Sequence, residues 1–493
     1  MTVDVFVSLF WLLRILANVL TYISLWYVKE YRFDRMFIHL QTSQGRRLLF
    51  MPFRRPPLSP KSIVIAAGSA FVLILGYIVI PYPLLFKLLL LDVMTFPITA
   101  LFVILTKIPT HFYHAFKISK AVRLIRSHAS MHVIAITGSY GKTSTKELLS
   151  TMLGVKYKTL KTDGSKNSPI AIAELICTKL RPDHEVFVVE MGAYKRGEIA
   201  EMCKMVRPEI SIVTAINAQH QDLFGSIENT IKAKYEIVEG LTGNGVAVFN
   251  ADNENTRKMG LKAEKSGITV HFYSSENFET SKNLDLRLDG EIQVSEAGIS
   301  FDVTHDGVTK SVSVPLLGKH HVSNIFAAMT AALSVGMTFD EVVASCKLIR
   351  PFDRTMQRID GKNSATFIDD TFNNNPDAAI AAIDYLSELK PKRILVFQPM
   401  IELGEYAVES HERVGEAAGK KCDEVILTND SYAEAFIRGV KLAGRGIKVS
   451  ILSGKNGAEY IKKQLNRGDT VLFKGKEASK ILRYLVSSAY PMQ

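Results

Sequence analysis

The stretch His132-Val-Ile-Ala-Ile-Thr-Gly-Ser-Tyr-Gly-Lys-Thr-Ser-Thr-Lys146 decides the fold. Its apolar, β-branched run from Val133 to Ile136 predicts a buried strand, and the run from Thr143 to Leu153 predicts a helix. A turn that contains Gly138 and Gly141 lies between them. Strand, glycine turn and helix N-terminus direct backbone N–H groups and the positive end of the helix dipole into one small space. The stretch therefore predicts a phosphate-binding loop.

The residue types in this loop fit that chemistry. Gly138 and Gly141 allow the backbone to approach a phosphate closely, Lys142 adds a positive charge, and Thr143 offers a hydroxyl to Mg²⁺. The spacing departs from G-x-x-x-x-G-K-[ST], because Ile136 holds the first glycine position. A lone G-x-x-G-K-T also occurs in ordinary loops, but the flanking strand and helix favour nucleotide binding.

Length and composition bound the other possibilities. A chain of 493 residues suggests two to four domains. Much of the net charge of +11 clusters beside apolar segments near the N-terminus, and the remainder shows no arginine-rich stripe, so we expect no nucleic-acid partner. The cysteines are isolated, with no C-x-x-C pair, which is typical of buried thiols in a reducing compartment. They are Cys177, Cys203, Cys346 and Cys422.

Residues 1–110 predict a membrane region with about three transmembrane helices. The predicted spans are Val5–Val28, Ser62–Ile80 and Leu84–Thr106. The loop 29–61 and the segment after the third span are both rich in Lys and Arg, which indicates that they lie in the cytoplasm. We therefore expect a multi-pass protein of the cytoplasmic membrane, in contact with the lipid bilayer, whose catalytic domains face the cytoplasm. The alternative is a re-entrant or interfacial third segment, which Lys87, Asp92 and Pro97 would favour.

Two α/β domains are predicted after the membrane region. Residues 111–350 alternate apolar runs with helical patterns, which indicates a central P-loop-type domain built on a mostly parallel sheet. Its predicted strands are Val133–Ile136, Val186–Val189, Ile210–Ala215 and Val246–Asn250, and a strand-rich stretch from Val270 to Pro315 is expected to be a peripheral β element. Residues 351–493 predict a smaller Rossmann-like α/β domain. Its strands are expected at Thr366–Asp369, Arg393–Gln398, Glu424–Thr428, Lys448–Leu452 and Thr470–Lys474.

Three polar residues follow strands of the central domain, where ligands of parallel sheets bind. Glu190 ends a buried strand, where a carboxylate is costly unless it meets a cation such as Mg²⁺; a capping or salt-bridged role is equally compatible. His220 follows another strand, and Lys234 opens a helix. Taken singly, His220 is compatible with a structural histidine and Lys234 with a solvated face.

Taken together, these strings resemble the Mur ligase family, which joins an amino acid or peptide to a carboxylate with ATP, and they are most similar to its MurF branch. The resemblance covers roughly His132 to Lys476 in order. The matching strings are Thr137–Ser144, Val189–Ala193, Asn217–Ser226, Lys232–Ile237, Phe249–Asn253, Gly318–Asn324, Ile368–Pro376 and Met400–His411.

The resemblance implies roles for particular residues. Lys142 and the loop Gly138, Ser139, Tyr140, Gly141, Thr143 and Ser144 would hold ATP phosphates. Asn324 would lie near the adenine, and Arg354 and Asp370 would add nucleotide contacts from the last domain. Thr143 and Glu190 would hold one Mg²⁺, and His220 with a carbamylated Lys234 would hold a second. Asp369, Asn373 and Asn375 would contact substrate, and His411 has the weakest case for a direct role.

The chain also departs from the family pattern. Phe372 stands where Tyr is usual, and Asn374 where a small residue is usual, which puts amine specificity in doubt. Gln398-Pro-Met400 replaces a glycine-led string, and Lys474-Gly-Lys-Glu477 replaces a K-G-S-[RQ] ending. Soluble members carry an N-terminal domain that binds the UDP-sugar, and predicted membrane spans occupy its place here.

The leading hypothesis is an ATP- and Mg²⁺-dependent, amide-forming ligase. It would phosphorylate the free carboxylate of a cell-wall precursor to an acyl phosphate, which a D-alanyl-D-alanine-like dipeptide or an amino acid then attacks. Two alternatives stay open: the same chemistry on a lipid-linked or other envelope polymer, and a membrane P-loop NTPase that drives a conformational switch.

Overall fold

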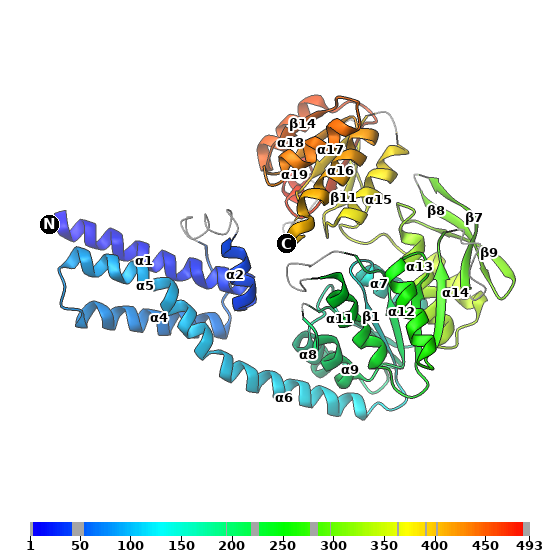
Figure 1. The fold of residues 1–493 in the computed structure, drawn as a ribbon, viewed down its shortest axis with the longest axis horizontal. Coiled ribbons are helices and arrows are strands. Elements are labelled where there is room, and N and C mark those ends of the chain that lie inside the picture. The colour runs from blue at the N-terminus through cyan, green and yellow to red at the C-terminus, as the bar shows by residue number, and fades with distance from the viewer. Residues whose placement is uncertain are drawn as a thin grey trace. The chain divides into compact units, whose positions relative to one another are not determined.

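The computed structural model describes residues 3–41, 54–193, 195–217, 226–276, 284–295, 297–361, 364–389, 392–400 and 403–486. The chain divides into two compact units, Met1–Lys117 and Ile118–Gln493. The second unit contains two β-sheets, and each sheet is covered by its own helices (Figure 1).

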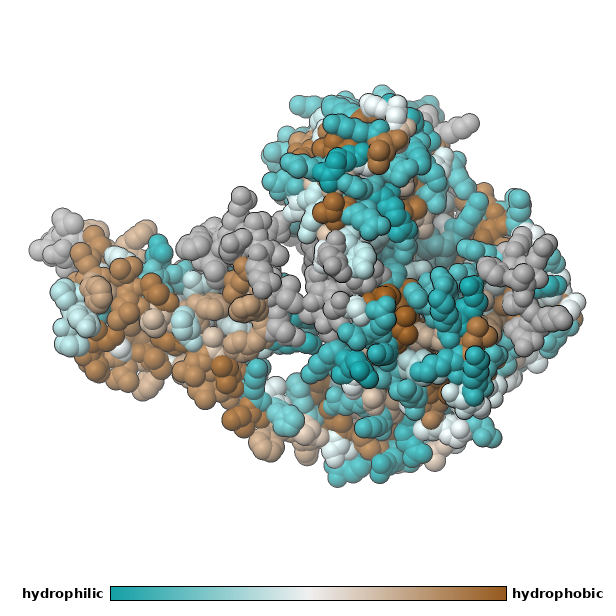
Figure 2. Space-filling model, in the orientation of Figure 1, coloured by the Kyte–Doolittle hydropathy of each residue, from teal (hydrophilic) through white to brown (hydrophobic). Residues whose placement is uncertain are grey.

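The first unit is a bundle of long apolar helices. These are α1 (Val3–Val28), α4 (Pro60–Val79) and α5 (Leu84–Leu105), with the short α2 (Phe33–Gln41) after α1. Each of the three long helices packs on the other two, and Ile23, Trp26 and Leu88 are buried between them. Most of the surface of each long helix is not covered by the rest of the chain. This uncovered surface is apolar (Figure 2). By length and composition, three helical segments can cross a membrane, which confirms the predicted positions of the apolar helices.

A polar cluster joins two helices of the bundle. The Asp92 carboxylate in α5 accepts hydrogen bonds from Asn18 Nδ2 at 2.7 Å and Trp11 Nε1 at 3.3 Å, and it pairs with Arg14 Nε at 2.9 Å. All three partners lie on α1. In an apolar surrounding, an unpaired Asp92 would be expensive, so the pairing explains how the helix accommodates it.

The central domain follows α6 (Lys107–Arg126) and is built on a sheet that has nine strands in the described part of the chain. The strand order is β2-β3-β1-β4-β5-β6-β7-β8-β9, and β2 to β7 are parallel. The strands are β1 (His132–Thr137), β2 (Thr159–Lys161), β3 (Val186–Glu190), β4 (Ile210–Val213), β5 (Val246–Asn250), β6 (Thr269–Ser274), β7 (Leu284–Ser295), β8 (Gly298–His305) and β9 (Val308–Val314). The four predicted strands are therefore confirmed. The stretch expected to be peripheral extends the main sheet through an antiparallel β7-β8-β9 meander.

Helices cover both faces of this sheet, because side chains alternate along each strand. In β1, Val133 and Ala135 enter one core, and Ile134 and Ile136 enter the other. The first core is covered by α6, α8 (Pro169–Lys179), α9 (Glu198–Val206), α11 (Ile227–Glu239) and α12 (Glu254–Lys265). The second is covered by α7 (Lys142–Leu153), α13 (His321–Ser334) and α14 (Phe339–Ser345).

The last domain is a smaller sheet with helices on both faces. Its strand order is β10-β11-β15-β12-β13-β14, parallel except for the edge strand β10, which the sequence patterns did not predict. The strands are β10 (Gln357–Asp360), β11 (Thr366–Asp370), β12 (Arg393–Phe397), β13 (Glu424–Leu427), β14 (Lys448–Ile451) and β15 (Thr470–Lys474). The helices are α15 (Pro376–Ser387), α16 (Ala407–Lys421), α17 (Ala433–Leu442), α18 (Gly454–Gln464) and α19 (Ala478–Leu485), with a short 3₁₀ turn at Gly404–Tyr406; another 3₁₀ turn, Cys346–Leu348, belongs to the central domain.

Candidate active site

The glycine turn lies at the carboxyl end of β1, between β3 and β4 in the sheet. Gly138 and Gly141 have φ angles of +151° and +81°. A Cβ on Gly138 would lie 2.0 Å from Thr214 Oγ1, and one on Gly141 would lie 2.4 Å from Asn324 Oδ1. Both positions therefore need glycine, for the backbone angle and for space. The turn ends at Lys142, where α7 begins. Backbone N–H groups of the helix N-terminus therefore face the space enclosed by the predicted phosphate-binding loop.

Two lysines converge on one carbonyl of this turn. Lys142 Nζ donates to Gly138 O at 2.6 Å and to Ser139 O at 3.4 Å. Lys234 Nζ, from the adjacent helix α11, donates to the same Gly138 O at 2.9 Å. Burial lowers the pKa of Lys142, although Glu190 opposes this. The pKa of Lys234 lies well below its usual value because of burial and then the nearby charge of Lys142. Lys234 therefore lies at the glycine turn, beside Lys142.

An oxygen pair suited to a hard cation stands at the helix N-terminus. Thr143 Oγ1 donates to Glu190 Oε2 at 2.9 Å, and Asn167 Nδ2 donates to Glu190 Oε1 at 2.9 Å. Glu190 is 1% exposed. Hydroxyl and carboxylate oxygens are ligands that Mg²⁺ accepts, usually with waters and phosphate oxygens in the remaining positions. Among the described residues, no three His, Cys, Asp or Glu side chains gather as a metal cluster. The Thr143 hydroxyl and the Glu190 carboxylate fit an ion whose other ligands are waters or phosphate oxygens.

A further lysine, Lys146, is fully buried beside Glu190. The sequence patterns did not predict it as a residue of this site. Its Nζ lies 3.5 Å from Glu190 Oε2 and donates to Gly164 O. From the sequence alone, a second lysine one helical turn after Lys142 would be expected to lie in solvent. It is buried because the loop before α8 covers it. Lys146 and Asn167 hold the Glu190 carboxylate in place.

Replacing Glu190 with glutamine is expected to raise the Mg²⁺ concentration needed for half-maximal ATP turnover by about tenfold or more, since the charged oxygen ligand is lost. The measurement is a Mg²⁺ titration of ADP release. The control is Glu185→Gln, because Glu185 is exposed and directly precedes the same strand, β3. If Glu190→Gln has the same Mg²⁺ requirement as the wild type, Glu190 does not bind the metal ion.

The remaining predicted residues of the loop have defined places. Ser139 Oγ accepts a hydrogen bond from Asn217 N at 3.1 Å, which ties the turn to the end of β4. Burial raises the pKa of Tyr140 to about 12. Ser144 lies in the first turn of α7. Asn324 Oδ1, on α13, accepts from Thr145 Oγ1 at 3.5 Å and faces Gly141. His220 lies outside the described residues.

The last domain contributes a second set at the carboxyl ends of β11 and β15. Asp370 pairs with Lys474 Nζ at 2.5 Å. Arg354, held at φ +59°, donates from Nε to Thr371 Oγ1 and from Nη2 to Thr371 O, both at 3.1 Å. Asp369 Oδ1 accepts from Thr371 Oγ1 at 2.6 Å, and burial raises the pKa of Asp369.

Two of the expected substrate contacts have local partners. Asn375 Oδ1 caps α15 by accepting from Ala378 N at 3.0 Å, and its side chain is 1% exposed. Asn373 Oδ1 accepts from Asn374 N at 2.9 Å. The structure thus assigns Asn375 a helix-capping role, which its position before Pro376 at the start of the helix also fits.

The departures from the family strings meet in space. Asn374 Nδ2 donates to Gln398 O at 2.6 Å, and Glu477 N donates to Gln398 Oε1 at 2.8 Å. The Glu477 carboxylate accepts hydrogen bonds from Thr428 and Asn429. The three substituted strings therefore form one hydrogen-bonded group at the carboxyl ends of the last sheet, and their changes are coupled.

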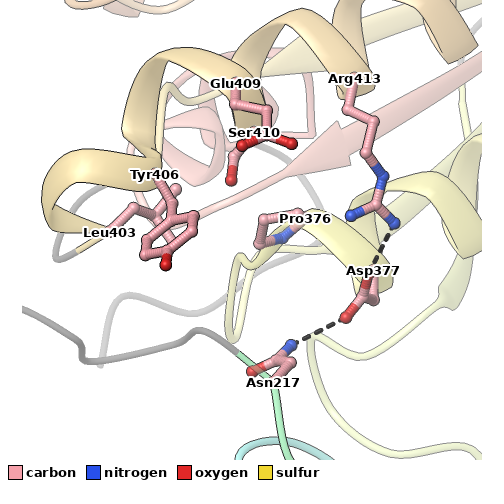
Figure 3. A pocket seen from close by; sticks show the side chains of 8 residues that line it. All are labelled: Asn217, Pro376, Asp377, Leu403, Tyr406, Glu409, Ser410 and Arg413. Carbon is pink, nitrogen blue, oxygen red and sulfur yellow. Dashed lines mark hydrogen bonds and ion pairs between the residues drawn. The ribbon is translucent and has the colours of Figure 1, made fainter. Parts of the chain in front are cut away.

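A small pocket lies where the two α/β domains meet (Figure 3). Asn217 Nδ2, after β4, donates to Asp377 Oδ2 at 2.8 Å, and Arg413 Nη2 donates to Asp377 Oδ1 at 2.9 Å. The pocket has a volume of about 100 Å³ and is also lined by Tyr406 and Ser410. Because Asn217 also bonds Ser139, a chain of polar contacts runs from the glycine turn into the last domain.

His411 is a structural residue. It is fully buried, its Nε2 accepts from Met400 N at 2.9 Å, and its Nδ1 lies 2.6 Å from Ala407 O. The ring also stacks on Tyr432, with centroids 4.6 Å apart. Both nitrogens are therefore engaged within the last domain, so the sequence-based suggestion of a direct catalytic role has no support from this geometry.

His411→Ala is expected to lower the free energy of unfolding by about 2–4 kcal/mol, because it leaves a cavity and an unpaired Met400 N–H. Chemical unfolding followed by fluorescence would measure it. Lys420→Ala, on the exposed face of the same helix, should stay within about 0.5 kcal/mol of the wild type. Equal stabilities for the two variants would contradict the structural role.

The fold and the site define a phosphate-binding α/β protein whose nucleotide loop is linked to a second α/β domain. Sequence comparison identifies the family more closely. The Mur ligase middle domain matches residues 136–332, and the Mur ligase glutamate ligase domain matches residues 354–477. Together they cover well over half of the chain. The chain belongs to the Mur ligase family.

Individual relatives agree with this assignment. The UDP-N-acetylmuramoyl-tripeptide–D-alanyl-D-alanine ligase of Escherichia coli K12 is 33% identical over 294 residues, which cover 60% of this chain and 63% of that enzyme. The Bacillus subtilis 168 enzyme of the same name is 27% identical over 364 residues, covering 72% and 76%. The chain thus spans slightly less than two thirds of the E. coli relative.

Solved structures show the same fold. MurF from Acinetobacter baumannii superposes with a TM-score of 0.69 at 24% identity and covers 76% of this chain and 81% of that one. MurF ligase from Thermotoga maritima in complex with ADP gives a TM-score of 0.66 at 25% identity, covering 76% and 82%. Both the parallel-sheet central domain and the C-terminal α/β domain are therefore confirmed.

Proposed function

We propose that this chain is an ATP-dependent ligase that adds a D-alanyl-D-alanine-like dipeptide or an amino acid to the free carboxylate of a cell-wall peptide precursor. The observation that carries the proposal is the meeting of Lys142, Lys234 and the Thr143–Glu190 pair at one glycine turn. The named relatives add D-alanyl-D-alanine to a UDP-N-acetylmuramoyl tripeptide.

The reaction has two balanced steps. A carboxylate oxygen of the acceptor attacks the γ-phosphorus of ATP, the bond to the β-γ bridging oxygen breaks, and ADP leaves. The amine nitrogen of the second substrate then attacks the acyl carbon of the acyl phosphate, inorganic phosphate leaves, and the amine loses a proton. Lys142 and the backbone N–H groups at the start of α7 stabilise the negative charge that develops on the transferred phosphoryl group.

Thr143 and Glu190 would hold Mg²⁺, which neutralises phosphate charge when bound. Lys234 has the chemistry for carbamylation, since only a neutral amine adds to CO₂ and burial beside Lys142 favours the neutral form. A carbamate would turn this lysine into an anionic oxygen ligand. His220 is proposed as a further ligand of a second ion, as the family pattern implies. Asn324, Arg354 and Asp370 are proposed to contact the nucleotide, and Asp369 and Asn373 the substrate.

We also propose that α1, α4 and α5 cross the cytoplasmic membrane, with residues 111–350 and 351–493 as cytoplasmic domains. Support comes from three helical segments long and apolar enough to span, flanked by basic residues. These helices favour a second form of the proposal, in which the same ligase chemistry acts on a lipid-linked acceptor at the membrane.

The test uses the full-length protein in detergent with ATP, Mg²⁺ and D-alanyl-D-alanine. UDP-linked and lipid-linked peptides that end in a carboxylate are offered separately, and ADP release and product mass are measured. A product heavier by the dipeptide minus water supports the proposal and identifies the acceptor. ATP turnover that needs neither carboxylate nor amine would instead indicate a conformational NTPase. Carbonate extraction of cell membranes tests the location, and a fully released protein would refute the membrane proposal.

A further inference from the structure

A second cavity lies on the central domain, away from the glycine turn. It has a volume of about 430 Å³ and is formed by α9, α11 and α12, which pack side by side (Figure 1). Four cationic side chains surround it. They are Arg196, Lys232, Lys258 and Lys262, and all four residues are exposed. The floor is apolar and aromatic, with Tyr235 and Met259.

The acidic residues of the cavity do not cancel this charge. Both oxygens of Glu236 are engaged, since Oε1 accepts from Gly197 N at 2.7 Å and Oε2 from Ala200 N at 3.1 Å. Glu239 is the other carboxylate in the lining, so four cations face two anions. Lys258 pairs with Glu254 at 2.6 Å on the surface, where such a pair is weak and easily exchanged for a stronger anion.

Part of the cavity lining lies at the same edge of the sheet as the glycine turn, and Glu239 and Lys262, in the last turns of α11 and α12, extend it toward the opposite edge. Arg196 and Ala200 stand at the start of α9, Lys232 in the second turn of α11, and Lys258 in the second turn of α12. These helices follow β3, β4 and β5, so their N-terminal turns lie at the carboxyl edge. One helix links the sites: Lys234 of α11 reaches Gly138 O, while Lys232, Tyr235 and Glu236 line the cavity.

The size and chemistry select a class of ligand. A volume of about 430 Å³ is larger than a simple phosphate ion needs. Lys262 Nζ lies 3.8 Å from the centre of the Tyr235 ring, so a cation and an aromatic surface are presented together. Several separate cations beside an aromatic floor fit a diphosphate attached to a larger group.

We propose that this cavity binds the diphosphate of the acceptor substrate and so anchors the acceptor on the central domain, beside the helix that carries Lys234. The inference rests on the proposed ligase function and names the part of the substrate recognised here. Both a nucleotide-linked and a lipid-linked precursor carry this group, so the shared chemistry is a diphosphate ester.

The test is direct binding to the full-length protein in detergent without added nucleotide, because ADP carries the same diphosphate and would compete for the cavity; the double variant below separates binding here from binding at the glycine turn. The probes are UDP and geranyl diphosphate, measured by calorimetry. The double variant Lys232→Glu/Lys262→Glu should weaken binding by about tenfold or more, because two phosphate contacts become repulsive. The control Lys265→Glu, an exposed lysine at the end of α12, should bind within about twofold of wild type.

Each result decides the matter. Tighter binding of UDP than of geranyl diphosphate supports the proposal with a nucleotide-linked acceptor, and equal binding supports it with recognition of the diphosphate itself, as in a lipid-linked acceptor. Absence of binding by both probes, or equal binding by the double variant and the wild type, would overturn it. The ligase function is judged separately by product mass: at saturating acceptor the double variant should keep its kcat while its KM for the acceptor rises.

Discussion

Lys142→Ala is expected to reduce ATP-dependent amide formation by at least about a hundredfold. The lysine ammonium lies on the carbonyls of Gly138 and Ser139, inside the turn that receives the phosphates. Charge that develops during phosphoryl transfer needs a fixed positive partner in a site shielded from water, and loss of one such partner typically costs about 10²–10³-fold in rate. Lys142 is half-buried, and this partial shielding from solvent strengthens its interaction with the phosphates.

The measurement is ADP release and product formation by the purified full-length protein. Lys142→Arg keeps the charge but not the shape, so it should recover only a small part of the activity. Lys166→Ala, an exposed lysine in the loop before α8, provides the matched control and should retain wild-type turnover. Lys142→Ala turnover close to that of the control would show that the glycine turn is not the phosphoryl-transfer site.

Lys234→Ala is expected to lower amide formation by at least about tenfold, and added formate or acetate should restore part of it. The residue is 4% exposed and its Nζ lies 2.9 Å from Gly138 O. If the working form is a carbamate, a small carboxylate that enters the space left by the side chain supplies the missing anionic oxygen. Lys234→Arg should not be rescued, because the guanidinium fills that space and stays protonated.

The pH dependence follows from the lowered pKa of Lys234. Above that pKa the amine is neutral and reacts with CO₂; as the pH falls through it, the amine is protonated and the carbamate is lost. Wild-type activity at low bicarbonate should therefore fall on the acidic side and recover when bicarbonate is added. Acetate-rescued Lys234→Ala should show neither the bicarbonate dependence nor this acidic limb. A wild-type enzyme indifferent to bicarbonate at every pH would argue against the carbamate.

Local patterns were sufficient for the elements and for the phosphate loop. Alternation of apolar side chains, as in Val133 to Ile136, forces a strand to divide between two cores, and a glycine turn before a helix can form only a limited set of backbone shapes. The order of strings along the chain also predicted the family, which the domain matches confirm. Lys142, Thr143 and Gly138 could be placed because they are neighbours in sequence.

Only the tertiary structure decided which distant residues share a site and which do not. Lys146 and Asn167 hold Glu190 although no sequence spacing marks them, whereas His411 and Asn375 lie in matched strings but serve the packing and capping of the last domain. The cavity beside α11 likewise depends on how α9 and α12 pack on that helix. The physical reason is that sequence fixes the chemistry and local geometry of each segment, while burial, pKa and hydrogen-bond partners depend on groups that only the packed chain brings within a few ångströms.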